Sequence, residues 1–307
     1  MAGYIDIGKK IYNLDNPREV RRMAAFVLMA KLHSKRINEL IDFFNSKPQL
    51  KPILEGLPFP IEQPTRAFFY KGSTFSERCR LIREHYDFLT EKIQDDAFLD
   101  MSLYDNRRGY VIWESEFEEQ PLRAVLITES GQRKEGCLSI ELNLGKQHLY
   151  QIMFWIAKDK EGNDAIWIGA LQGPNMEDAK ELVKRMTKFC HGYRTKNLIL
   201  YMLQAVARAM RIGRIYAVTN EGYYANNHVR LDRKLKTSFS DFWAEAGGEP
   251  TDDSRFFVLP LIETRKTMEE VPTRKRAVYR RRFAFLDEVD DSIGKKVRAA
   301  IKSHKGC

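Results

Sequence analysis

A basic cluster stands directly before a strongly apolar run, at residues 189–203, which read FCHGYRTKNLILYML. A helix that begins here offers unpaired backbone N–H groups and a partial positive charge, and nearby cations add to both. We therefore predict a phosphate-binding site formed by His191, Gly192, Arg194, Lys196 and Asn197. The alternative is a solvated basic loop ahead of a core helix, because the stretch matches neither the Walker nor the dinucleotide-binding pattern.

Polar residues also follow a predicted strand at 214–220, where the chain continues as EGYYANNH. Glu221 would act as a general base there, and Tyr223 or Tyr224 would act as a general acid. His228 would add a further hydrogen-bonding group. The alternative is a polar turn built on Asn and Gly.

A second candidate base is Glu245, in the segment SDFWAEAGGEP at 240–250. If Glu245 lies against the aromatic surface of Trp243, burial raises the pKa of its carboxyl group and makes it a proton acceptor. The alternative is that Trp243 anchors the segment and Glu245 faces solvent.

The segment from Arg265 to Arg282 carries eight Lys or Arg residues against two Glu. Tyr279, Phe283 and Phe285 are interleaved with these cations or follow them. Such a segment would contact anionic lipid headgroups, or form a solvated basic face. Nucleic acid is not expected as the partner, because no recognition module is present.

Composition agrees with an anionic ligand but does not identify one. The chain has 307 residues and a net charge of +9, which attracts phosphates and anionic membranes. Its four cysteines are scattered without a Cys-x-x-Cys pair, which is typical of reduced thiols. We expect no metal, because HExxH and Cys/His pairs at metal spacing are missing from the sequence.

We expect a soluble cytoplasmic protein, at most peripheral to the inner membrane. The N-terminal MAGYIDIGKK lacks the features of a secretory signal. The most apolar early run, residues 23–30, is far shorter than the roughly 20 residues of a spanning helix.

The elements that would position these residues change from helices to strands along the chain. Helical periodicity covers residues 17–46, and a second helix with a Ser/Thr cap is expected over 75–92. From residue 109 the pattern favours five strands, and their short links favour antiparallel neighbours. Two helices, a strand, a further strand and a final helix then follow, at 176–189, 198–210, 214–220, 256–262 and about 275–289.

The fold class predicted from this order is α+β, with a mostly antiparallel sheet and packed helices. We expect a helical N-terminal region at 1–106, an α+β core at 107–290 and a basic C-terminal tail at 291–307. The oligomeric state is not indicated by any pattern in the sequence.

A series of motifs, in this order, resembles the VirK/YbjX family of bacterial proteins. They are LQGP (171–174), HGYRTKNLIL (191–200), AVTN (217–220), FWAEAGG (242–248), LPLIETRK (259–266) and VPTRKRAVYRRRF (271–283), and ERCRLIREHYDFL (77–89) fits the N-terminal half. The resemblance covers about residues 20–288. It implies a Gram-negative, cytoplasmic protein associated with virulence, the cell envelope and tolerance of antimicrobial peptides. It implies no particular reaction.

The order of elements is also similar to acyl-CoA-dependent N-acyltransferases of the GNAT kind. That resemblance implies acyl-CoA as the cofactor, with its phosphates at residues 191–197, Glu245 or Glu221 as base, and Tyr223 or Tyr224 as acid. The usual Gln/Arg-x-x-Gly-x-Gly/Ala loop is missing from the sequence, and an extra helix precedes the candidate loop. The rival interpretation is a non-catalytic adaptor that binds an anionic membrane surface or a partner through its basic C-terminal region.

Overall fold

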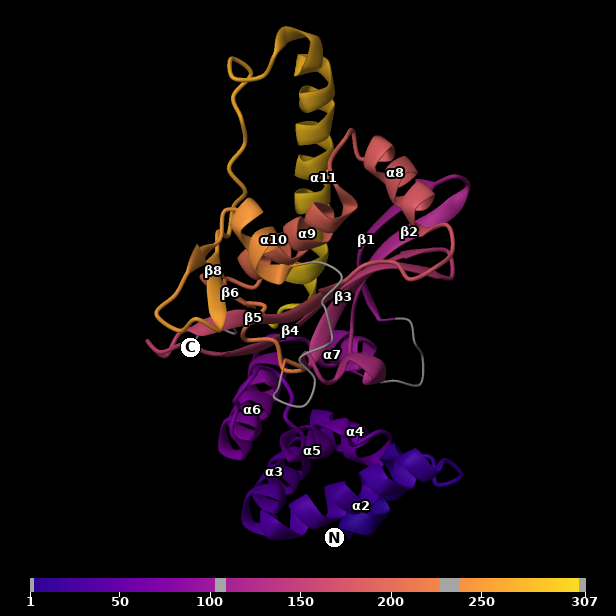
Figure 1. Ribbon diagram of the computed structural model, residues 1–307, viewed down its shortest axis with the longest axis vertical. Coiled ribbons are helices and arrows are strands. Elements are labelled where there is room, and N and C mark those ends of the chain that lie inside the picture. The colour runs from indigo at the N-terminus through magenta and orange to yellow at the C-terminus, as the bar shows by residue number, and fades with distance from the viewer. Residues whose placement is uncertain (1–2, 103–108, 227–237, 304–307) are drawn as a thin grey trace.

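The chain places a helical region at one end of a central sheet. The computed structural model describes residues 3–102, 109–226 and 238–303. In Figure 1 the N-terminal helices lie at the bottom, the sheet crosses the middle, and helix α11 rises at the top. Within these ranges no helix is both long and apolar enough to cross a membrane.

Seven α-helices form most of the N-terminal region of the described chain. Helices α1 to α7 span Tyr4–Ile11, Pro17–Leu32, Ser34–Ser46, Lys51–Glu55, Phe59–Glu62, Phe75–Lys92 and Asp95–Ser102. The prediction of one helix over 17–46 is wrong at His33, where the chain breaks and the imidazole stacks on Phe75 at 4.0 Å. Helix α6 has the predicted cap, because Thr74 and Glu77 form a capping box.

The five strands predicted from residue 109 onward are confirmed. In the described residues the sheet has eight strands in the order β1-β2-β3-β4-β5-β6-β8-β7. Their bounds are Tyr110–Phe117, Gln120–Ile127, Leu138–Leu144, Gln147–Lys158, Asp164–Gln172, Arg214–Val218, Glu249–Pro250 (β7) and Phe256–Leu259 (β8). All neighbours in the described sheet are antiparallel except β5 and β6. The predicted α+β class, with a mostly antiparallel sheet, is therefore confirmed.

Two helices join the parallel strands, because a parallel connection must cross the length of the sheet. Helix α8 spans Ala179–Phe189 and helix α9 spans Thr195–Ala209. Since α9 ends just before β6 begins, its first turn lies toward the carboxyl ends of β5 and β6. Helix α10, Phe239–Glu245, follows β6 and is tied to its end by a 2.9 Å bond from Trp243 Nε1 to the carbonyl of Val218.

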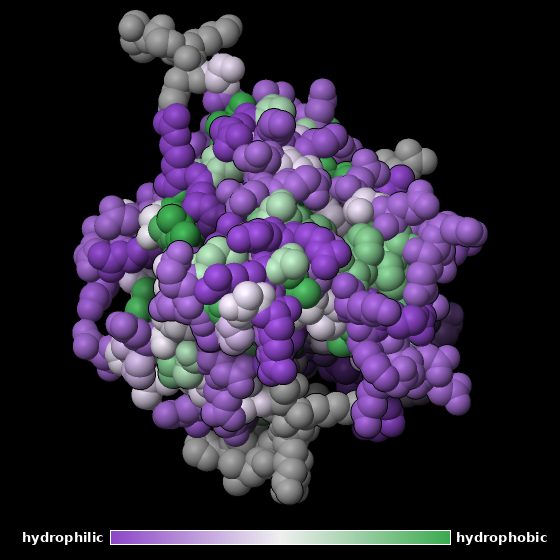
Figure 2. All heavy atoms as spheres, turned by 90° about the horizontal axis from the view of Figure 1, so that it is seen from above, coloured by the Kyte–Doolittle hydropathy of each residue, from purple (hydrophilic) through white to green (hydrophobic). Residues whose placement is uncertain are grey.

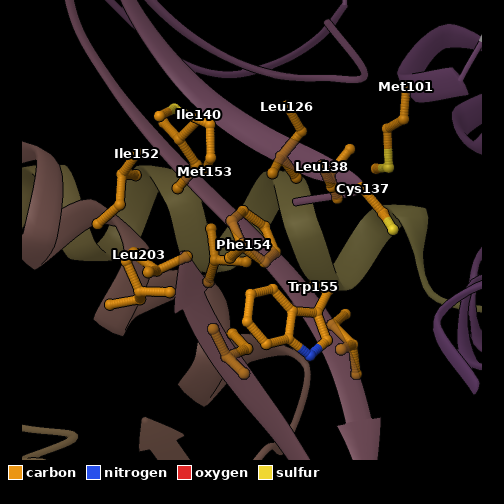
Figure 3. Close-up of a cluster of buried hydrophobic side chains, with 14 of the residues drawn as sticks. Met101, Leu126, Cys137, Leu138, Ile140, Ile152, Met153, Phe154, Trp155 and Leu203 are labelled. Atoms are coloured by element: carbon orange, nitrogen blue, oxygen red, sulfur yellow. The ribbon is translucent and has the colours of Figure 1, made fainter. Parts of the chain in front are cut away.

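The core lies between the sheet and the helices that cover it. Figure 3 shows side chains of β3 and β4 packed with Leu203 of α9, and Phe154 and Leu203 are fully buried. Helix α11, Arg276–Ala300, also packs on α9 and on β1. Its residues Ile293 and Val297 are fully buried, so packing continues beyond residue 291. Residues 304–307 of the expected tail lie outside the described ranges.

Candidate functional site

The parallel strands β5 and β6 separate toward their carboxyl ends. Their pairing runs from Ala165↔Arg214 to Ile168↔Ala217, whereas β5 itself continues to Gln172. Ligands of sheets with parallel strands commonly bind outside the carboxyl ends of those strands. This edge, with the first turn of α9 on the same side, is therefore the place in the fold where a site is expected.

A bulge in β5 brings Glu135 to this edge. The register between β4 and β5 shifts at Gly169, which is the extra residue in β5. A Cβ atom on Gly169 would lie 1.8 Å from the carbonyl oxygen of Glu135. The backbone of Glu135 thus packs against β5 where the parallel strands separate, and only glycine permits this approach.

Glu135 is a buried acid in contact with two tyrosines. The residue is 3% exposed, and its Oε1 accepts a 3.2 Å hydrogen bond from the Tyr223 hydroxyl. Burial raises the pKa of Glu135 to about 7, although Lys134 and hydrogen bonds from Tyr223 and Tyr224 favour the ionised form. Burial and the neighbouring carboxyl group also raise the pKa of Tyr223, so its phenol is protonated at neutral pH. A carboxyl group whose pKa is near neutral pH can accept a proton, and the phenols of the two tyrosines can donate one. This combination is suited to acid–base chemistry.

The loop that follows β6 holds both tyrosines in place. The Asn220 side chain accepts a 2.7 Å bond from the Phe239 N–H and donates a 2.9 Å bond to Ser238 Oγ, which ties the loop to α10. The rings of Tyr223 and Tyr224 meet edge to face, with centroids 4.9 Å apart. Both tyrosines are half-buried, so they are accessible from solvent while Glu135 behind them is shielded.

The first turn of α9 carries the predicted phosphate site, and its cations already have partners. Arg194 forms a 3.2 Å ion pair with Glu245, and both side chains are exposed. The Nζ atom of Lys196 lies 3.8 Å from the centroid of the Phe242 ring, and burial lowers the pKa of this amine. A phosphate group at this helix start would therefore have to displace Glu245 from Arg194.

The pocket beside the start of α9 contains carboxylates. It has a volume of about 240 Å³, and its lining includes Asn197, Glu245 and Glu263. The Tyr193 hydroxyl donates a 2.6 Å bond to Glu263 Oε2 within this lining. These carboxylates would repel an anion inside the pocket. A phosphate at the first turn of α9 would therefore have to bind outside this pocket.

His191 and Gly192 precede α9 in the left-handed conformation, with φ angles of 53° and 77°. Arg282 of α11 donates a 3.1 Å bond from Nε to the carbonyl of His191. A Cβ atom on Gly192 would lie 2.9 Å from a guanidinium nitrogen of Arg282. Arg282 is thus a cation beside the start of α9 that the predicted site does not include. It lies 90 positions after Gly192 in the sequence.

The structure assigns different partners to the predicted base and acid. Glu245 pairs with Arg194, Glu221 is exposed, and the carboxyl group that Tyr223 contacts belongs to Glu135. His228 lies outside the described residues. Glu135 stands in the polar segment KEG before β3, where nothing in the sequence distinguishes it from an exposed turn residue.

A second feature is a projecting segment that we call the basic arm, residues 262–285. Figure 1 shows the chain rising after β8 and returning as the outer half of α11, beyond the sheet. Figure 2 looks onto this end of the molecule and shows a largely hydrophilic surface. Five cations of the arm are exposed: Lys266, Arg274, Lys275, Arg280 and Arg281.

The described residues form an α+β protein whose sheet has one parallel strand pair, β5 and β6. A cluster of Glu135, Tyr223 and Tyr224 lies at the carboxyl end of that pair. The chain belongs to the DUF535 family, described as a protein of unknown function, whose family model matches residues 15–295. The resemblance to YbjX-like proteins is thereby confirmed.

Relatives in other bacteria match most of this chain. It is 27% identical over 276 residues to the "Uncharacterized protein YbjX" of Escherichia coli, covering 89% of this chain and 81% of the relative. It is 26% identical over 271 residues to an uncharacterized protein of Haemophilus influenzae, covering 88% and 87%. It is also 26% identical over 210 residues to "Membrane protein LapB" of Mannheimia haemolytica, covering 67% and 84%. No solved structure matches the chain.

Proposed function

We propose that this protein is an acyltransferase whose active site is the carboxyl edge of β5 and β6. The observation that carries the proposal is the hydrogen bond between Glu135, whose pKa is about 7, and Tyr223. The order of strands, helix α9, β6 and a tyrosine pair agrees with the order of elements in the GNAT-like acyltransferases that the sequence resembles. The nucleophile in this proposal is an amine and the donor is an acyl-CoA thioester.

The chemistry follows from the positions of the three side chains. An attacking amine passes its proton to the Tyr223 hydroxyl while Tyr223 passes its own proton to Glu135. The amine nitrogen bonds to the acyl carbon, and the carbon–sulfur bond breaks. Tyr224 protonates the departing thiolate and regains a proton from Glu135. An amide and a free thiol result, and the side chains return to their starting states.

The donor phosphates would lie at the first turn of α9, on the same edge of the sheet. Arg194, Lys196 and Asn197 remain the candidate contacts in this proposal, with the unpaired N–H groups of the helix start. Because Glu245 holds Arg194, donor binding requires an exchange in which a phosphate replaces the Glu245 carboxylate.

Calorimetric titration with acetyl-CoA tests this exchange. The double variant Arg194→Ala/Lys196→Ala is expected to bind acetyl-CoA about tenfold more weakly, because two cations are lost. Glu245→Gln is expected to bind it about two- to fivefold more tightly, because an exposed ion pair of modest strength no longer competes. The exposed Glu221→Gln serves as a control for removal of one carboxylate. Unchanged affinity in both the double variant and Glu245→Gln would exclude the helix start as the donor site.

The exposed cations of the basic arm favour a second function, attachment to an anionic membrane surface. Each Lys or Arg near such a surface contributes on the order of 1 kcal/mol. One relative carries the name "Membrane protein LapB". In this proposal the arm contacts lipid headgroups, while the sheet and its Glu135 site remain in the aqueous phase.

Co-sedimentation with phosphatidylserine vesicles tests attachment by the basic arm. Reversal of four of its exposed cations, Arg274, Lys275, Arg280 and Arg281, to Glu is expected to weaken binding at least tenfold. A matched control reverses four exposed cations of the N-terminal helices: Arg21, Lys31, Lys35 and Arg36. The control has the same net charge as the arm variant, so equal losses in both would show that net charge, and not the arm, determines binding. Binding of the wild type should also fall as salt is raised.

A further inference from the structure

A row of aromatic side chains crosses one face of the sheet. Trp155 lies opposite Trp167 across β4 and β5, and Trp167 lies opposite Tyr216 across β5 and β6. Directly opposite residues on neighbouring strands share a face of the sheet. The ring centroids of these two pairs are 6.3 and 4.3 Å apart, with interplanar angles of 6° and 20°. The three rings therefore stand nearly parallel in a row.

Two further rings turn this row into a box. The ring plane of Phe256, in β8, is inclined by 79° to that of Trp167 and by 72° to that of Tyr70. The corresponding ring centroids are 5.0 and 5.2 Å apart. All five rings line a pocket of about 470 Å³, within the range of small-molecule sites. Tyr70, Tyr216 and Phe256 are less than 10% exposed, whereas Trp167 is half-buried. The walls are thus fixed by packing before any ligand arrives, which limits the entropy lost on binding.

Most of the charged side chains around this box neutralise one another. Three ion pairs join the lining residues: Lys160–Asp252 at 3.0 Å, Arg214–Glu161 at 2.5 Å and Arg255–Asp253 at 2.6 Å. The lining residue Arg80 pairs with Glu84 outside the pocket at 2.9 Å. Each cation of the lining therefore has an acidic partner. The guanidinium of Arg255 also lies over the Tyr70 and Phe256 rings, 4.9 and 5.9 Å from their centroids, so these rings already attract one cation of the protein.

Glu77 of α6 is different, because in the described part of the chain no Lys or Arg forms an ion pair with it. Its Oε2 accepts a 2.7 Å bond from the Thr74 N–H, and its Oε1 accepts a 3.2 Å bond from the Tyr70 hydroxyl. Although burial opposes ionisation, hydrogen bonds from Thr74 and Tyr70 lower the pKa of Glu77, so it is charged at neutral pH. The charge of Arg255 also favours the ionised form of Glu77, but Arg255 forms its ion pair with Asp253. Among the described residues, Glu77 is thus the carboxylate of the lining that no ion pair neutralises, next to the Tyr70 wall of the box.

We infer that this pocket binds an organic cation, a methylated ammonium group held between the aromatic walls and Glu77. Aromatic faces carry partial negative charge and attract ammonium groups within about 6 Å of the ring centroid. The Glu77 carboxylate, which forms no ion pair in the described part of the chain, adds to this attraction, and the methyl groups favour the apolar rings over water. Glu135, Tyr223 and Tyr224 do not line this pocket, so the inference does not depend on acyl transfer.

Choline and its neutral isostere 3,3-dimethylbutan-1-ol separate charge recognition from simple apolar burial. In calorimetric titrations of the full-length protein, choline is expected to bind at least tenfold more tightly than the isostere, because only choline is cationic. Equal affinities, or no binding of choline, would overturn the inference.

Variants of the box identify the pocket as the site of binding. Trp167→Leu and Glu77→Gln are each expected to weaken choline binding about tenfold, whereas Trp167→Phe keeps an aromatic face and loses less. Glu77→Gln retains acceptor capacity at its side-chain oxygen, and thermal unfolding checks that each variant is folded. If Trp167→Leu does not fold, the other two variants still test the site. Unchanged affinity for choline in both Glu77→Gln and Trp167→Phe, measured on folded protein, would contradict the assignment. Exposed Glu221→Gln is the matched control.

The ammonium group can belong to a free small molecule or to a lipid headgroup. Phosphatidylcholine vesicles distinguish the two sources. Co-sedimentation that free choline reverses would assign the pocket to a headgroup, whereas choline binding without vesicle binding would assign it to a free metabolite. Failure of both choline and vesicles to bind would reject the site.

Discussion

Glutamine in place of Glu135 is expected to slow acyl transfer about 1000-fold while acetyl-CoA binding stays unchanged. General acid–base groups typically contribute 10²- to 10⁴-fold to a rate. A glutamine side chain can still accept the Tyr223 hydrogen bond, but it cannot take up the proton of the nucleophile. Thiol release from acetyl-CoA, with lysine, spermidine and ethanolamine as amine acceptors, measures the rate. Glu221→Gln removes an exposed carboxylate from the neighbouring loop and should retain full activity.

The pH dependence provides a second test of the same residue. Since the raised pKa of Glu135 is about 7, the acid is protonated below this pH and cannot accept a proton. The wild-type rate should therefore rise with pH up to about 7 and then level off, and Glu135→Gln should lose this rise. Because burial raises the pKa of Glu135 from 4.5 to about 7, its contribution to folding stability falls as pH rises through this interval and then stays constant. The variant should thus be at least as stable as the wild type at pH 8, which separates lost activity from unfolding.

The fold could be predicted from local pattern because most of its elements are half-buried. Alternating or continuous apolar residues identified β1 to β5, and the Thr74 capping box identified the start of α6. The sequence does not predict the break at His33, because the helical periodicity continues across it and the stacking partner, Phe75, comes from another helix. The sequence indicates the two helices between β5 and β6. The parallel alignment of these strands follows from that helical connection.

The site was harder to predict because its contacts join residues that are distant in sequence. Tyr223 and Tyr224 were identified from their place after a strand, but the carboxyl group that they contact is Glu135, 88 residues before Tyr223. The cations at α9 were identified from their spacing, whereas their partners, Glu245 and Phe242, come from α10. Local sequence shows which groups carry charge, but it does not show which of those charges the fold has already neutralised.

Gly169→Ala is expected to destabilise the protein by about 3 kcal/mol, a factor of roughly 150 in the folding equilibrium. A Cβ atom there would lie 1.8 Å from the Glu135 carbonyl oxygen and 2.8 Å from its carbonyl carbon. Both atoms belong to the backbone and cannot rotate away, so either β5 or the segment that carries Glu135 must move. Urea unfolding followed by circular dichroism measures the change.

Gly213→Ala is the control, because a Cβ atom at Gly213 meets no atom within 4 Å and its φ angle is not in the left-handed region. It should leave stability unchanged or raise it slightly, since alanine restricts the unfolded chain. If Gly169→Ala is as stable as Gly213→Ala, the close packing of Glu135 against β5 is not needed for folding. If Gly169→Ala folds with reduced stability, the displaced Glu135 should also lose its contact with Tyr223, and the pH-dependent rise in transfer rate should weaken. The same glycine therefore links the stability of the sheet edge to the chemistry proposed for it.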